Sequence, residues 1–203
     1  MKIMFRRCGF VYTDCVLERY REINYRVWES YKHGKISKDA LQTKRFTELF
    51  EQIGAVCDAK KFNDAFLYEM GKNANLIEGA EDICKLIVSR GKKIYIVSNG
   101  IIITQESRME HSPIKKYVSD FFVSERAGFR KPEAGFFDYV FAHIQSVKKE
   151  NILIVGDSLT ADIKGGRGAG IKTCWFNPDG KENCTDISPD YEIRRLSELE
   201  VFL

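Results

Sequence analysis

The chain has 203 residues, of which 44% are hydrophobic and 30% are charged, and its formal net charge is +3 at pH 7. This composition excludes intrinsically disordered, collagen-like and disulfide-scaffold proteins. No apolar run reaches the about 18 residues of a membrane span. Arg6 and Arg7 stand where a signal peptide needs its apolar stretch, so we expect no secretory leader. Lysine and arginine form no dense basic stripe, which argues against nucleic acid as a partner.

The cysteines also limit the class of protein. The chain has six of them, with no C-x-x-C pair and no metal-ligand spacing. We therefore expect ordinary thiols in a reducing, cytoplasmic environment.

The first part of the chain shows only helical patterns. Apolar residues recur every three or four positions over 16–31, which predicts a helix that Gly34 ends. Ser37 is placed to cap a second helix, and Asp58 is placed to cap a third. Because no β-rich segment intervenes, we predict that residues 15–75 are all helical.

From residue 79 onward, helices alternate with short apolar strands. We expect helices over 80–89, 103–112, 133–146 and 160–169, strands over 93–97, 121–123, 152–155 and 173–176, and a short edge strand at 191–193 before a last helix. This alternation predicts an α/β fold, with a parallel sheet and helices on both faces. The continuous apolar runs fit strands that are buried on both sides.

Polar residues follow three of these strands, at the edge where ligands bind in an open parallel sheet. In chain order they are Ser98, Asn99 and Gly100, then Lys131, then Asp157 and Asp162. A hydroxyl, backbone amides and an ammonium group suit a phosphate, and a pair of carboxylates suits Mg²⁺. Asp157 lies at a strand tip and Asp162 about one helical turn later, so both can face the same ion.

Three sequence stretches carry a resemblance to a known family: IVSNG at 96–100, FVSERAGFRKP at 122–132 and LIVGDSLTADIKGG at 153–166. With them the chain resembles the haloacid dehalogenase-like (HAD) superfamily, and within it the pyrimidine 5′-nucleotidase-like phosphatases. The resemblance implies a Rossmann-like core at 79–203 and an all-helical cap at 1–78 that selects the substrate. It also implies a Mg²⁺-dependent phosphomonoesterase that converts nucleoside monophosphates to nucleoside and phosphate.

The same resemblance implies a role for each candidate residue. Ser98, in the second motif, would hydrogen-bond the transferring phosphoryl group together with Asn99 and Gly100. Lys131, in the third, would steady the nucleophile and the phosphate. Asp157 and Asp162, in the fourth, would bind Mg²⁺. Arg126 stands where the family usually has an aspartate, and we interpret it as a solvated loop charge.

The family's first motif, D-x-D-x-T, has no match in this chain. Its first aspartate attacks phosphorus and its second acts as general acid and base. The only acid before residue 18 is Asp14, and Val16 stands where the second carboxylate is needed, so we interpret Asp14 as a helix-start residue. A makeshift strand at 2–5 would put Arg6, which cannot attack phosphorus, in the nucleophile position. A short helix or coil is favoured there.

We therefore expect the central first strand of the fold to be missing between the strands at 93–97 and 152–155. Mg²⁺ binding would be weakened and hydrolysis lost, as in a truncated phosphatase. The alternative is a non-catalytic pseudoenzyme that binds phosphate or nucleotide, or that accepts a strand from a partner protein. Dehalogenase chemistry would need the same missing aspartate.

Overall fold

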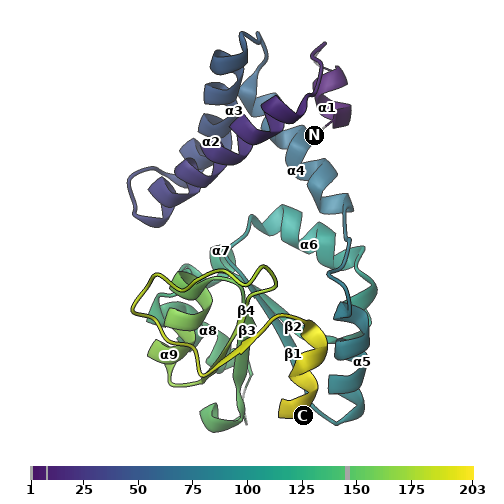
Figure 1. Cartoon of the computed structure of the whole chain (residues 1–203), viewed down its shortest axis with the longest axis vertical. Helices are drawn as coiled ribbons and strands as arrows, with labels where there is room; N and C mark the ends of the chain where they lie inside the picture. The colour runs from purple at the N-terminus through teal and green to yellow at the C-terminus, as the bar shows by residue number, and fades with distance from the viewer. Residues whose placement is uncertain (1, 8, 145–146) are drawn as a thin grey trace. The chain divides into compact units, whose positions relative to one another are not determined.

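The structure is a computed structural model that describes residues 2–7, 9–144 and 147–203 (Figure 1). The chain forms two compact units, Met1–Met70 and Gly71–Leu203. The cap–core boundary that the sequence predicts, 78/79, lies in the segment between helices α4 and α5. In the described parts of the chain, no helix is both long and apolar enough to cross a bilayer.

The first unit is helical, as predicted. Its helices are α1 Lys2–Arg7, α2 Asp14–Lys32, α3 Lys38–Ile53 and α4 Ala59–Lys72. Ser37 Oγ accepts a hydrogen bond from the Ala40 amide at 3.2 Å, which confirms the predicted cap of α3. Asp58 Oδ1 accepts from the amides of Lys60 and Lys61 at the start of α4, both at 3.0 Å. The segment at 2–5 is part of α1, so the makeshift strand is wrong and the short helix is confirmed.

Aromatic rings fill the core of this unit. Tyr20, Phe46, Phe62 and Phe66 are buried, and the ring centroids of Phe46 and Phe62 lie 4.8 Å apart. These rings come from α2, α3 and α4, so packing between the amphipathic helices holds the unit together.

The second unit alternates between helices and strands. Its α-helices are α5 Ala80–Ser89, α6 Ile102–Glu110, α7 Ser124–Ala127, α8 Ala134–His143 and α9 Lys164–Ala169. Its strands are β1 Ile94–Ser98, β2 Val118–Val123, β3 Leu153–Gly156, β4 Lys172–Phe176 and β5 Tyr191–Ile193. Short helical turns complete it: η1 Pro113–Tyr117, η2 Lys149–Asn151, η3 Leu159–Ile163 and η4 Leu196–Phe202. The predicted α/β pattern is confirmed, with two local differences: the predicted last helix is the 3-10 helix η4, and the helix predicted at 160–169 begins as the π-turn η3.

Helices cover both faces of the strands, with α8 and α9 on one side and α5 and η4 on the other (Figure 1). Strand β3 contributes side chains to the core on both faces, because Ile154 packs with α8 while Leu153 and Val155 pack with α5 and η4. Close packing also explains Gly166, where a Cβ atom would lie 2.5 Å from Ile154 Cγ2. Gly170 ends α9 with a φ of +74°, as expected of a C-terminal cap.

All strand pairs are parallel, and they form two sheets. One contains β1 and β2, and the other has the order β3–β4–β5. Within the described residues, β1 pairs with β2 alone and β3 with β4 alone, so each has one edge without a strand partner. That a central strand is missing between them stays a prediction.

Candidate functional site

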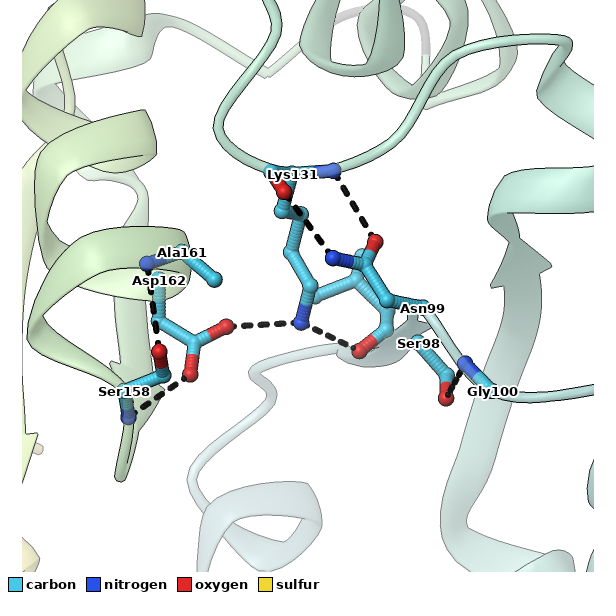
Figure 2. Close-up of polar contacts among 8 residues, drawn as sticks. Ser98, Asn99, Gly100, Lys131, Ser158, Ala161 and Asp162 are labelled. Carbon is cyan, nitrogen blue, oxygen red and sulfur yellow. Dashed lines mark hydrogen bonds and ion pairs between the residues drawn. The ribbon is translucent and has the colours of Figure 1, made fainter. Parts of the chain in front are cut away.

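The candidate site is built from residues at the carboxyl end of β1 and in the segments that follow β1, β2 and β3 (Figure 2). Ser98 is the last residue of β1, and its hydroxyl oxygen accepts a hydrogen bond from the Gly100 amide at 3.0 Å. Because this bond closes the turn after β1, the Ser98 hydroxyl has a fixed position at the carboxyl end of the strand.

Asn99 holds the backbone of Lys131 through two hydrogen bonds. The Lys131 amide donates to Asn99 Oδ1, and Asn99 Nδ2 donates to the Lys131 carbonyl, both at 2.9 Å (Figure 2). This reciprocal pair fixes the loop after β2 against the end of β1. Asn99 thus positions the lysine rather than only contacting a ligand, a role that the motif did not indicate.

The ammonium group of Lys131 joins the ends of two strands. Its Nζ atom donates to the Val97 carbonyl of β1 at 2.9 Å and to Asp162 Oδ1 at 2.6 Å. Asp162 Oδ2 accepts from the Ser158 amide at 3.1 Å. The side chains of Lys131 and Asp162 are only 9% and 8% exposed, so this is a nearly buried ion pair.

Gly156 makes room for the Asp162 carboxylate. A Cβ atom at this position would lie 2.3 Å from Asp162 Oδ2, which is far inside van der Waals contact. Asp162 belongs to the π-turn η3, and Ser158 Oγ caps that turn by accepting from the Ala161 amide at 3.2 Å. The residue types at Gly156, Ser158 and Asp162 therefore each have a steric or hydrogen-bonding reason.

Asp157 is exposed at the end of β3, and its carbonyl accepts from Trp175 Nε1 of β4 at 3.1 Å. Among the described residues no three acidic, histidine or cysteine side chains gather as a metal site. Mg²⁺ often takes only one or two protein carboxylates and completes its shell with waters and phosphate oxygens. Asp157 is exposed, whereas both carboxylate oxygens of Asp162 already accept hydrogen bonds from Lys131 Nζ and the Ser158 amide, so the sharing of one Mg²⁺ by the two aspartates stays a prediction.

Glu125 is a site-adjacent residue that the motif analysis did not single out. Its Oε1 atom accepts from the Ile102 amide at 3.0 Å, at the first turn of α6. Its neighbour Arg126 forms an ion pair with Glu106, with 53% and 38% of the two side chains exposed. Asp14, the only early acid, is the first residue of α2 and directly follows the cap Thr13, as a helix-start residue should.

Residues 16–176 match the profile of the haloacid dehalogenase-like hydrolases. The chain belongs to this family. The resemblance inferred from the three strand-end motifs is therefore confirmed.

Relatives of this HAD chain include enzymes that act on nucleotides. It is 34% identical over 180 residues to the pyrimidine 5′-nucleotidase PynA of Streptococcus pneumoniae, covering 89% of the chain and 76% of PynA. It is 31% identical over 201 residues to the pyrimidine 5′-nucleotidase YjjG of Escherichia coli, covering 98% of the chain and 88% of YjjG. These matches support the nucleotidase-like subgroup.

A solved structure gives the fold match. The chain is 38% identical to the candidate HAD-hydrolase YfnB of Bacillus subtilis over 199 residues, covering 98% of the chain and 84% of YfnB. The crystal structure of YfnB bound to magnesium superimposes with a TM-score of 0.93, covering 100% of this chain and 88% of that one. The HAD fold predicted from the sequence is thus confirmed.

Proposed function

We propose that this HAD chain supplies the phosphate- and Mg²⁺-binding part of a phosphatase site for nucleoside monophosphates. The observation that carries the proposal is the buried Lys131–Asp162 pair at the carboxyl ends of β1 and β3, beside the Ser98 turn. The pyrimidine nucleotidases among the relatives support the substrate class. The helical unit would act as the cap that selects the nucleoside, in a cytoplasmic setting.

Each residue has a part in binding. Lys131 would neutralise the phosphate, and Ser98 would donate its hydroxyl proton to a phosphate oxygen. Asn99 keeps Lys131 in place through its two backbone hydrogen bonds. Asp157 and Asp162 would hold Mg²⁺, which supplies positive charge that neutralises and orients the phosphate. Because these are only two carboxylates, we expect Mg²⁺ binding to be weak without phosphate.

The proposal includes no hydrolysis by this chain alone. Phosphoryl transfer to a carboxylate needs an acid that can approach phosphorus beside the lysine. Within the described part of the chain, the carboxylate bonded to Lys131 Nζ is that of Asp162, and the Ser158 amide also holds it. Asp162 is therefore held by Lys131 and Ser158 and is not placed to attack phosphorus.

Calorimetry tests the binding half of the proposal. We expect phosphate and UMP to bind the full chain in the presence of Mg²⁺, and Lys131→Met to abolish that binding. Binding that is unchanged in Lys131→Met would contradict the proposed site. We further expect no release of phosphate from UMP, dUMP or p-nitrophenyl phosphate. Mg²⁺-dependent turnover that disappears in Asp157→Asn would show that the chain does hydrolyse its ligand.

A second candidate function is that of a protein that accepts a strand. It is favoured by β1 and β3, which are apolar on both faces and which, among the residues that the structure describes, each pair with a strand on one edge alone. Ile94 and Ile96 of β1 are only partly buried and pack on neither core cluster that the strands share with the helices. The partner would be an extended apolar segment of about five residues, ending in an acid that Lys131 can bind.

Hydrogen exchange tests this second function. The probes are synthetic peptides that tile the part of YfnB outside the match with this chain. We expect one peptide to slow amide exchange in β1 and β3, and a version with a central proline to have no effect. If no peptide protects these strands, or if β5 is protected equally, the chain does not accept a strand at this position.

A further inference from the structure

The backbone of a second lysine in this unit, Lys181, is hydrogen-bonded in the same way as the backbone of Lys131. The Lys181 amide donates to Asn177 Oδ1, and Asn177 Nδ2 donates to the Lys181 carbonyl, both at 2.9 Å. Asn99 makes the same two bonds to Lys131, also at 2.9 Å. In both cases the asparagine is the first residue after a parallel strand, β1 for Asn99 and β4 for Asn177.

The two hydrogen bonds between Asn177 and the Lys181 backbone, here called the Asn177 clamp, form a rigid arrangement. Asn177 is only 2% exposed, and its Nδ2 atom also donates to Glu192 Oε1 of β5 at 2.7 Å. The Gly180 amide donates to the Asn177 carbonyl at 3.1 Å, and Gly180 has a φ of +63°, which closes the turn before Lys181. A buried amide with its bonds satisfied leaves the loop little freedom, so the backbone of Lys181 has a fixed position.

Lys181 follows β4, the strand that pairs with β3, and the candidate magnesium ligands follow β3. In the parallel pairing of β3 with β4, Gly156 lies opposite Trp175, so Asn177 follows β4 beside the turn that starts at Asp157. The Trp175 indole donates to the Asp157 carbonyl at 3.1 Å, which ties the two strand ends together. The hydrogen bond that Lys181 Nζ donates to the Asp179 carboxylate raises the pKa of Lys181, and the charge of Asp157 adds to the effect.

The side chain of Lys181 is available to a ligand. Its Nζ atom lies 2.9 Å from Asp179 Oδ2, and the two side chains are 72% and 67% exposed. Exposed ion pairs of this kind contribute little to stability, so a dianionic ligand can replace Asp179 as the partner of the ammonium group with a small loss of free energy. The hydrogen bonds to Asn177 hold the Lys181 backbone in the loop after β4, the strand that pairs with β3.

We propose that Lys181 is a second anion-binding cation of this site, which contacts the phosphate of a nucleoside monophosphate from the β4 side while Lys131 holds it from the β1 side. The inference rests on the proposed function and adds a residue outside the strand-end motifs. It assigns the buried Asn177 a positioning role equivalent to that of Asn99.

Calorimetry of inorganic phosphate with Mg²⁺ tests the proposal on the full chain. We expect Lys181→Met to weaken binding about threefold to tenfold and Lys181→Arg to restore most of it, since the charge is what matters. The matched control is Lys148→Met, because Lys148 is also exposed, also pairs with an acid at 3.8 Å, and precedes the amino end of β3. Lys148→Met should stay within twofold of the wild type. The Lys181 effect should shrink in high salt.

The outcomes separate this proposal from the function on which it rests. If Lys131→Met loses binding while Lys181→Met keeps wild-type affinity, Lys181 is no part of the site and the proposed function stands. Equal weakening in Lys181→Met and Lys148→Met would also overturn the proposal, because it would indicate only a general charge effect. Wild-type protein that binds no phosphate, or that binds it equally in Lys131→Met, would overturn both.

Discussion

The ammonium group of Lys131 lies 2.6 Å from Oδ1 of Asp162, and 91% or more of each side chain is buried. Lys131 also donates to the Val97 carbonyl of β1, while Asp162 follows β3. One ion pair thus connects strands that belong to different sheets. The pair therefore has a structural role, which stability measurements can test separately from its proposed role in binding.

Removing one partner of this pair should cost more than removing both. Lys131→Met leaves the Asp162 charge buried without its cation, and Asp162→Leu does the reverse, so each should lower the free energy of unfolding by about 3 kcal/mol. The double variant should lose less than either single one. Urea unfolding followed by Trp175 fluorescence in a Trp28→Phe background would measure this, since Trp28 and Trp175 are the two tryptophans of the chain. Losses that simply add would show that the two charges do not depend on each other.

Gly156→Ala should damage the site by displacing Asp162. The added methyl group would lie 2.3 Å from Asp162 Oδ2, so the carboxylate must move away from the Ser158 amide. We expect Mg²⁺-dependent phosphate binding to fall at least tenfold in calorimetry. Gly168→Ala is the control, because nothing lies within 4 Å of its Cβ position in α9, and alanine there should add about 0.5–1 kcal/mol of stability. Wild-type phosphate affinity in Gly156→Ala would mean that Asp162 has room to shift without loss.

The sequence predicted which strand ends carry the candidate residues, and it did not predict how their side chains pair. Alternation of apolar strands and helices was enough to place Ser98, Lys131 and Asp162 at the carboxyl edge. The Lys131–Asp162 contact depends on strand order and rotamers, which a one-dimensional pattern does not contain. The steric reason for Gly156 and the clamp by Asn99 likewise depend on atoms that only the folded chain brings together.

Helix boundaries were predicted best where the sequence carries a local signal such as a capping residue. Helix α5 runs from Ala80 to Ser89, as expected, and Ser37 and Asp58 cap their helices as predicted. The last helix, predicted to follow the edge strand at 191–193, forms the 3-10 helix η4, Leu196–Phe202, instead. Apolar periodicity does not distinguish the two geometries over so few turns.

The thiol of Cys174 should make the core unit less stable at alkaline pH. Cys174 is fully buried in β4, and burial raises its pKa to about 11. In the unfolded chain the thiol ionises near its ordinary pKa of about 8.5. A raised folded-state pKa gives stability below the unfolded value that is lost as pH rises through the folded value. The free energy of unfolding should therefore fall between about pH 8.5 and 11.

Cys174→Ala should remove most of this fall in the free energy of unfolding with pH. Cys184→Ala, which changes an exposed thiol, should leave the pH dependence unchanged. Iodoacetamide at pH 8 should modify Cys184 and spare Cys174 in the folded protein, because the thiolate is the reactive form. Rapid modification of Cys174 under native conditions would show that β4 opens locally and that the thiol is not held in the core.

Arg45 should be the residue on which the helical unit depends most. It is 4% exposed, its Nη2 atom donates to Asn63 Oδ1 at 2.9 Å, and its Nη1 atom donates to Asn24 Oδ1 at 3.2 Å. The guanidinium lies over the rings of Phe46 and Phe66, 5.0 and 5.3 Å from their centroids. Burial lowers the pKa of Arg45, because the surrounding amides and rings only partly replace the water that solvates its charge.

Arg45→Met would leave the side-chain oxygens of Asn24 and Asn63 without this donor, and Asn63 is itself 1% exposed. We expect a loss of about 2–4 kcal/mol, since the buried Asn63 oxygen left unsatisfied costs about 1–3 kcal/mol and the ring contacts are lost as well, while the partly buried Asn24 oxygen still accepts from Tyr20. Hydrogen exchange resolved by residue would show faster exchange in α2, α3 and α4, with β3 and β4 unchanged. Arg26→Met is the control, because the Arg26 side chain is 61% exposed in its pair with Glu48 and should cost less than about 0.5 kcal/mol. Equal effects of the two substitutions would mean that the buried guanidinium is not what joins the three helices.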